Sequence, residues 1–241
     1  MRAKIGWILI AIVGVFFINN LAIDLLTPSL GGESSVDENA LFDRIVKDDS
    51  VNIVAANTVE VNGAIGLNFE ATGYVNVGEA APNIYINSAE DGYYDTNTLA
   101  YILTHEYSHV LQKRLVAEVS GGYPNRWNPI QSAIYYYNFL RLNNELAANT
   151  PGLGENFTSV ATFEHLETNA DCLTQTEGLW LQEYSYIGFN YCKDNQLGAA
   201  YAVADGEWPT DENIQKYVAL LNSGELDPYG ADRSSLFAEK H

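Results

Sequence analysis

The chain has 241 residues, of which 47% are hydrophobic and 12% aromatic. This composition excludes a disordered chain and predicts one folded domain of roughly 200 residues behind a short leader. Its formal net charge is −19 at pH 7, with 31 acidic and 12 basic residues. So acidic a chain is a poor nucleic-acid binder, because neutralising phosphates requires clustered lysine and arginine.

The N-terminus has the order of a targeting segment. Arg2 and Lys4 form a short basic start, and residues 5–18 are an uninterrupted run of 14 apolar residues and glycines. A run of that length fits a signal peptide and is short for a membrane span. No clear cleavage site follows, so residues 1–28 are predicted to be either a signal peptide or a signal-anchor segment. Either way the rest of the chain is expected outside the cytoplasm, secreted or anchored to the membrane.

A change of composition marks the start of the domain. Residues 29–40 are small, polar and acidic, which predicts a linker to a domain at 41–241. Short runs of strand-forming residues bounded by Gly, Asn and Pro then predict strands at 51–54, 65–69 and 83–87. The rest of the chain favours helices. A small N-terminal sheet followed by a mainly helical half indicates an α+β fold.

Capping residues and chain breakers predict four helices after the strands, at roughly 95–115, 128–148, 160–183 and 211–221. The first begins at Asp95 or Thr96, which are both good N-cap residues. The second begins at Asn128 as cap, with Pro129 in the first turn. The last ends before Gly224, a residue type that commonly terminates helices.

The first predicted helix carries the motif His105-Glu106-Tyr107-Ser108-His109. Residues four apart lie one above the other on a helix, so both imidazoles can bind one tetrahedral Zn²⁺. The Glu106 carboxylate beside them is placed to deprotonate a water that the metal activates. This HExxH pattern predicts a zinc hydrolase with His105 and His109 as ligands and Glu106 as general base. The alternative is a helix that carries two surface histidines by chance.

A catalytic zinc site needs a third protein ligand and keeps one position open. The candidates all lie on the helix predicted at 160–183: Glu164, His165, Glu167 and Asp171. The three acids share one face, whereas His165 points about 160° away from Glu167. His165 and Glu167 therefore cannot both reach the metal, and spacing alone leaves the choice among the acids open.

The two cysteines agree with export. Cys172 and Cys192 are 20 positions apart, and an even count in an oxidising compartment predicts one disulfide. The bridge would join a short loop to the helix that carries Cys172. The alternative is two unpaired buried thiols.

Two segments resemble a bacterial family of exported or membrane-tethered neutral zinc metallopeptidases. Glu167–Cys172 (ETNADC) is similar to its E-x-x-A-D-C segment, and His105–Gln112 (HEYSHVLQ) is similar to its H-E-x-G-H-x-x-Q segment. Ser108 and Asn169 stand where that family usually has glycine and glutamine. More broadly, an aspartate four residues after a glutamate resembles the second motif of gluzincins.

The resemblance implies a zincin fold and peptide-bond hydrolysis. It implies Glu167 as the third zinc ligand, and Asp171 as the acceptor of the free ring N–H of a zinc-bound histidine. It also implies that the strand predicted at 83–87, just before the motif helix, lines the substrate site, as that strand often does in zincins. The expected partner is a peptide or protein substrate, together with the membrane if the leader is retained. Two alternatives remain: a non-catalytic extracellular binding domain with structural or no zinc, and a zinc amidase acting on cell-wall peptides.

Overall fold

The computed structural model describes residues 38–46, 48–56, 73–87, 96–125, 127–149, 164–179 and 191–227. Their elements are α2 (Glu38–Ile45), β1 (Asn52–Ala56), β2 (Gly73–Val75), β3 (Asn83–Asn87), α4 (Thr96–Ser120), α5 (Pro129–Asn149), α6 (Glu164–Thr176), α7 (Asp194–Ala204) and α8 (Asp211–Ser223). A three-stranded sheet with mainly helical structure around it is compatible with the predicted α+β class. Helix α2 begins inside the stretch predicted as linker.

The three strands form one mixed sheet in the order β1-β3-β2. Strand β3 pairs in parallel with β1 and antiparallel with β2. Alternation places Ile84 and Ile86 in the core, on one face of the sheet. Strand β3 has the predicted bounds and β1 overlaps its predicted range, whereas the strand predicted at 65–69 lies outside the described residues. Strand β2 was not predicted.

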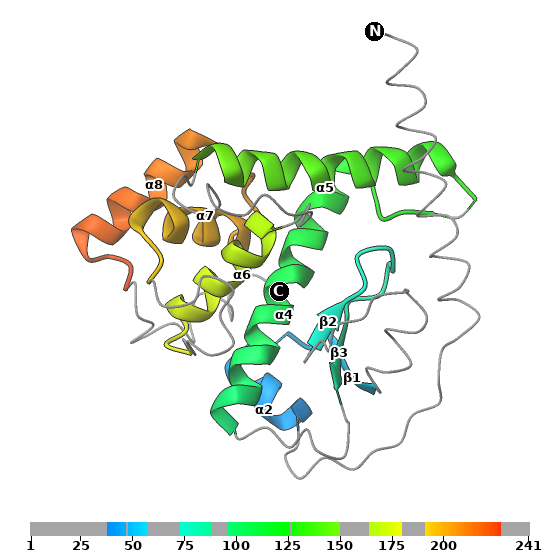
Figure 1. Cartoon of the computed structure of the whole chain (residues 1–241), viewed down its shortest axis with the longest axis horizontal. Coiled ribbons are helices and arrows are strands. Elements are labelled where there is room, and N and C mark those ends of the chain that lie inside the picture. The colour runs from blue at the N-terminus through cyan, green and yellow to red at the C-terminus, as the bar shows by residue number, and fades with distance from the viewer. Residues whose placement is uncertain are drawn as a thin grey trace, which may run out of the picture.

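Helix α4 is the centre of the molecule, with the sheet on one side and α6, α7 and α8 on the other (Figure 1). From Thr98 to Ala117 every residue is buried except His105, His109 and Arg114, which are partly exposed. A helix buried on all sides is enclosed by other elements rather than lying at the surface. The helix therefore presents the two histidines at a local opening in its packing.

A buried lysine fastens the β2–β3 connection to α4. The Nζ atom of Lys113 donates hydrogen bonds to the backbone oxygens of Asn76, at 3.1 Å, and Ala81, at 2.7 Å. Burial lowers the pKa of Lys113 to about 8, and the nearby Glu79 carboxylate opposes that shift. Two carbonyl acceptors compensate for burying this amine, and they hold the connection beside the helix.

The ends of the later helices follow local signals. Asn128 Oδ1 accepts the N–H of Gln131 at the start of α5, as predicted. Helix α6 ends at Thr176, so the prediction that it continues to 183 was wrong. The reason is Gly178, whose φ of 69° lets the N–H of Leu179 close the helix onto the oxygen of Thr174. Helix α7 was not predicted, and α8 ends at Gly224 as expected.

A disulfide joins Cys172 of α6 to Cys192, two positions before α7. This confirms the predicted pairing.

Helices α7 and α8 cross at close range. A Cβ atom on Gly198 would lie 2.8 Å from the backbone oxygen of Ile214.

Among the helices that the structure describes, none combines the length and the apolar composition that a membrane span requires. The predicted leader, residues 1–28, lies outside the described residues.

Candidate metal centre

Three side chains from two helices converge on one point. In α4, the Nε2 atoms of His105 and His109 lie 3.1 and 3.3 Å from the same carboxylate oxygen, Oε2 of Glu167 in α6. The donor atoms of the three residues lie within 4.8 Å of one another. The two histidines were predicted from the sequence motif. The packing of α4 against α6 brings the third donor, Glu167, to them.

Asp171 forms a hydrogen bond with the Nδ1 side of the His105 ring. His105 Nδ1 lies 3.0 Å from Oδ1 of Asp171, a fully buried residue. The same oxygen accepts a hydrogen bond from the hydroxyl of Tyr101 at 2.7 Å. An ionised carboxylate can only accept, so the proton lies on Nδ1 and Nε2 is left to face Glu167. This is the contact expected of Asp171.

Gln112 holds His109 in the same way. Its side-chain oxygen lies 2.9 Å from Nδ1 of His109. Its side-chain nitrogen donates to the backbone oxygen of Leu166 and to Oδ1 of Asn169, both at 3.0 Å. Each histidine therefore has a fixed partner on Nδ1 and directs Nε2 at the same point.

The histidines and the carboxylate shift one another's pKa. Burial lowers the pKa of His105, but hydrogen bonds to Asp171 and Glu167 outweigh it and hold that pKa well above its ordinary value. Burial also lowers the pKa of His109, but the Glu167 carboxylate outweighs it and raises that pKa above its ordinary value. Burial raises the pKa of Glu167, but the two histidines outweigh it and hold that pKa well below its ordinary range. These shifts favour a positive charge next to an ionised carboxylate, and a metal cation that bound here would take the place of a proton.

Glu106, which directly follows His105 in α4, is 6% exposed. Burial raises its pKa, while His109 and His105 act in the opposite direction. Strand β2 lies directly against it, because a Cβ atom on Gly73 would be 2.9 Å from Cγ of Glu106 and 3.1 Å from Oε1. Only a residue without a side chain fits at this contact.

The strand in contact with Glu106 is therefore β2, and the role expected of the strand at 83–87 in lining the substrate site stays a prediction. Strand β3 lies in the middle of the sheet with β1 and β2 on its two sides, so its backbone hydrogen bonds are already used. Strand β2 packs against α4 and contacts Glu106 through Gly73. Three residues with a glycine first give too short a pattern to be recognised as a strand.

The other two candidates on α6 lie outside the convergence point. Glu164 Oε1 lies 4.0 Å from Nε2 of His165, and neither belongs to the group of converging donors in the described residues. The backbone N–H of His165 donates to Asn143 Oδ1 on α5. Among the acids that share a face of α6, the structure brings Glu167 to the Nε2 atoms of both histidines and Asp171 to Nδ1 of His105.

Tyr101 and Gln112 were not predicted as site residues. Their helical spacing carried a signal, since Tyr101 precedes His105 by four residues and Gln112 follows His109 by three. Gln112 also donates to the backbone of Leu166 and to the side chain of Asn169. These two contacts depend on how α6 packs against α4, which no local sequence pattern shows.

The donor set fits zinc. Two imidazole nitrogens and one carboxylate oxygen are ligands that Zn²⁺ accepts, and bonds of about 2.0–2.1 Å in a tetrahedron separate neighbouring donors by about 3.3 Å. The observed separations of 3.1 and 3.3 Å between nitrogen and oxygen are close to that value. Hydrogen-bonded Nδ1 atoms are also typical of metal-binding histidines.

No protein-family model, curated protein or solved structure matches the chain.

Proposed function

We propose that this protein is a zinc-dependent metallopeptidase that hydrolyses peptide bonds, with a zincin-type, gluzincin-like centre. The observation that carries the proposal is the convergence of His105 and His109 on Glu167, with the buried Glu106 carboxylate on the same helix. The two motif segments that resemble neutral zinc metallopeptidases support it. Both segments contribute to one point in space, although about sixty residues separate them along the chain.

The residues divide the chemistry between them. His105, His109 and Glu167 would hold the ion, which would act as a Lewis acid on a water molecule and on the scissile carbonyl. Glu106 takes the proton of the attacking water and returns it to the leaving nitrogen. The burial that raises the pKa of Glu106 makes its carboxylate a stronger base for the first transfer. Asp171 and Gln112 keep both imidazoles in the tautomer that leaves Nε2 free.

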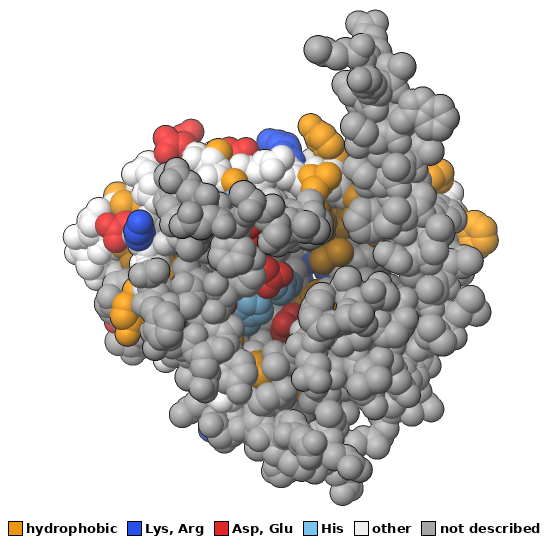
Figure 2. Space-filling view, in the orientation of Figure 1, with side chains coloured by type: hydrophobic (Ala, Val, Ile, Leu, Met, Phe, Trp, Pro, Cys, Tyr) orange, Lys and Arg blue, Asp and Glu red, His pale blue; other side chains and the backbone are white. Residues whose placement is uncertain are grey.

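The accessibility of the site favours catalysis over a structural role. Structural zinc sites are closed by four protein ligands, whereas catalytic sites have three and an open position. The described residues offer three, with side chains 13% exposed for both histidines and 39% for Glu167. Figure 2 shows histidine side chains, with acidic side chains beside them, in a hollow of the surface. This arrangement argues against a non-catalytic binding domain.

We also propose that the domain acts outside the cytoplasm. The basic and apolar start of the chain favours export, and the Cys172–Cys192 disulfide is typical of oxidising compartments. A cell-wall peptide is the second candidate substrate class, since the same chemistry cleaves amide bonds outside proteins and export would bring the enzyme to them.

The test uses the purified full chain and its Glu106→Gln variant. Zinc content is measured first, and then hydrolysis of casein, of a peptide library and of cell-wall peptides with and without a chelator. We expect one zinc per chain in both proteins, chelator-sensitive cleavage of casein or library peptides by the wild type, and loss of nearly all turnover in the variant. Glu118→Gln, an exposed position on the same helix, is the matched control. Full zinc occupancy without hydrolysis of any substrate would refute an enzymatic role, and cleavage of cell-wall peptides alone would favour the amidase.

A further inference from the structure

The first half of α5 is apolar on two opposite faces. Its inner face is buried in the core through Tyr135 and Phe139. Its outer face carries Ile130 and Tyr137, whose side chains are 72% and 62% exposed. A helix at the surface of a water-soluble domain normally carries polar residues on its outer face. The outer face of α5 thus has the composition of a surface that another apolar phase covers.

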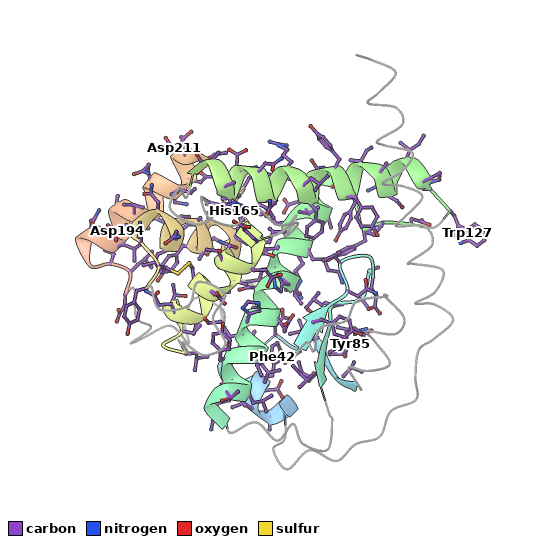
Figure 3. The ribbon with its side chains drawn as sticks, viewed as in Figure 1. Phe42, Tyr85, Trp127, His165, Asp194 and Asp211 are labelled. Atoms are coloured by element: carbon purple, nitrogen blue, oxygen red, sulfur yellow. A yellow bond between two sulfur atoms is a disulfide. The ribbon has the colours of Figure 1, made fainter. Side chains whose placement is uncertain are left out.

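Four exposed side chains in α5 and just before it form a stripe, here called the α5 stripe: Trp127, Ile130, Ile134 and Tyr137. Residues 130, 134 and 137 follow the i, i+4, i+7 spacing that aligns side chains on one helix face. Trp127 is 81% exposed and projects away from the domain at the beginning of the helix (Figure 3). The stripe combines large aliphatic side chains with the aromatic types that are enriched where protein meets the headgroups of a bilayer.

The charge of the same region differs from that of the rest of the chain. Between Glu118 and Glu145 there is no acidic residue, and the charged residues are Arg126 and Arg141. Residues 119–144 therefore carry +2, and since the whole chain carries −19 the remainder carries −21. Arg141 lies one helical turn beyond Tyr137, and its guanidinium group packs 4.8 Å from the ring of Trp208. Anionic headgroups would repel most of this molecule and would attract this segment.

We propose that the α5 stripe rests on the surface of a phospholipid bilayer that contains anionic lipids. The stripe supplies apolar and aromatic side chains for the boundary between headgroups and acyl chains, and the two arginines supply the matching charge. Residues 5–18 have the composition of a signal peptide or a signal anchor, and a retained anchor would keep a membrane next to the domain.

The length of the chain between the predicted anchor and the domain does not determine which face of the domain meets the membrane. Residues 19–37 separate the apolar run from α2, and 19 residues span at most about 65 Å when extended. A domain of this size is about 40–45 Å across. Any face can therefore reach the bilayer, and the stripe selects the one that does. The orientation of the metal centre relative to the membrane then follows from the position of α5.

The test labels the full chain, reconstituted in vesicles of phosphatidylcholine and phosphatidylglycerol, at one introduced cysteine. Ile134→Cys places an environment-sensitive fluorophore in the stripe, and Glu212→Cys places it on an exposed position of α8. We expect the label at 134 to emit at shorter wavelength and to lose intensity to a lipid-bound nitroxide quencher, with no change at 212. Equal exposure of the two labels to water overturns the proposal.

A second set of measurements separates the bilayer from other occupants. Trp127→Ser and Ile130→Ser, introduced together into the labelled Ile134→Cys variant, should abolish the shift in emission wavelength. Both positions are exposed enough for the fold to tolerate the change. Vesicles of phosphatidylcholine alone should give a smaller shift, and an undiminished one would contradict the charge argument. A shift that grows with protein density but is insensitive to the lipid quencher would show that a second copy covers the stripe, and would overturn the proposal.

Discussion

The backbone oxygen of Leu166 in α6 determines the tautomer of His109 in α4 through the side chain of Gln112. A carbonyl oxygen can only accept a hydrogen bond, so the amide nitrogen of Gln112 must face Leu166, at 3.0 Å. The amide oxygen of Gln112 then faces Nδ1 of His109 at 2.9 Å, and Nδ1 must carry the proton. Nε2 is left free to bind a metal. The helix that carries Glu167 thus also prepares His109.

Replacing Gln112 with leucine should weaken zinc binding by about 10–100-fold, the usual effect of removing a hydrogen-bond partner of a metal-binding histidine. The affinity is measured by competition with a chromogenic chelator. Gln131→Leu is a matched control, because Gln131 also donates to two backbone oxygens, of Ser120 and Gly122, but lies away from the site. Equal zinc affinity in the Gln112 variant and the wild type would contradict this account.

The contact between β2 and Glu106 predicts a catalytic defect without loss of metal. In Gly73→Ala the new methyl group would lie 2.9 Å from Cγ of Glu106 and 2.9 Å from Cγ2 of Ile102. Such distances force the side chain or the strand to move, and a small displacement of a general base is costly to the rate. We expect kcat to fall by about 10–100-fold, with zinc content unchanged.

Gly198→Ala provides the comparison for this variant. It is the same chemical change, but the methyl group would lie 2.8 Å from the backbone oxygen of Ile214, at the α7–α8 crossing. Here we expect a lower melting temperature, since overpacking of this kind typically costs about 1–3 kcal/mol, and normal activity per folded molecule. The Gly73 assignment fails if both variants lose only stability.

The parts of the site that follow helical spacing could be predicted from sequence. His105, Glu106 and His109 share a helix, so their mutual arrangement is fixed once that helix forms. Strand β3 was recognised with its bounds because a short run of strand-forming residues follows Pro82 and lies between Asn83 and Asn87. The choice between Glu164 and Glu167 could not be made in this way, because both lie on one face of α6.

What could not be predicted depends on contacts between distant segments. The polar residues of helix α4 are buried together with its apolar ones, because the sheet and the helices α2, α5, α6 and α7 pack against it. Thr104 and Lys113 are accommodated by hydrogen bonds to backbone oxygens. A buried polar residue with such a partner looks the same in sequence as one exposed to water.

The disulfide should contribute to stability. It closes a loop of 20 residues, for which chain entropy gives about 3 kcal/mol. In a domain of about 200 residues that corresponds to a decrease of about 6–12 °C in melting temperature after reduction. Thermal unfolding is followed with and without a reductant. The double variant Cys172→Ala/Cys192→Ala should melt near the reduced protein and show no response to reductant, and a response there would assign the effect to something other than this bridge.

A buried carboxylate that is not one of the converging donors predicts a specific dependence of stability on pH. Asp48 is 2% exposed and accepts hydrogen bonds from Ser50, from the hydroxyl of Tyr107 and from Arg114. Burial raises its pKa, but Arg114 and Ser50 outweigh that effect and lower the pKa to about 2 from an ordinary 3.8. The folded state therefore binds this proton less readily than the unfolded state. The stabilisation is fully present above about pH 5 and is lost as pH falls toward 2.

We expect Asp48→Asn to reduce the free energy of unfolding by at least about 2 kcal/mol near neutral pH, the free energy of a shift of that size. The difference from wild type should shrink as pH falls from about 5 to 2, because protonation removes the same charge from the wild type. Urea unfolding at a series of pH values measures it. Asp43→Asn, an exposed position on α2, should show no such trend. A difference for Asp48→Asn that stays constant down to pH 2 would mean that Arg114 and Ser50 do not stabilise the ionised carboxylate.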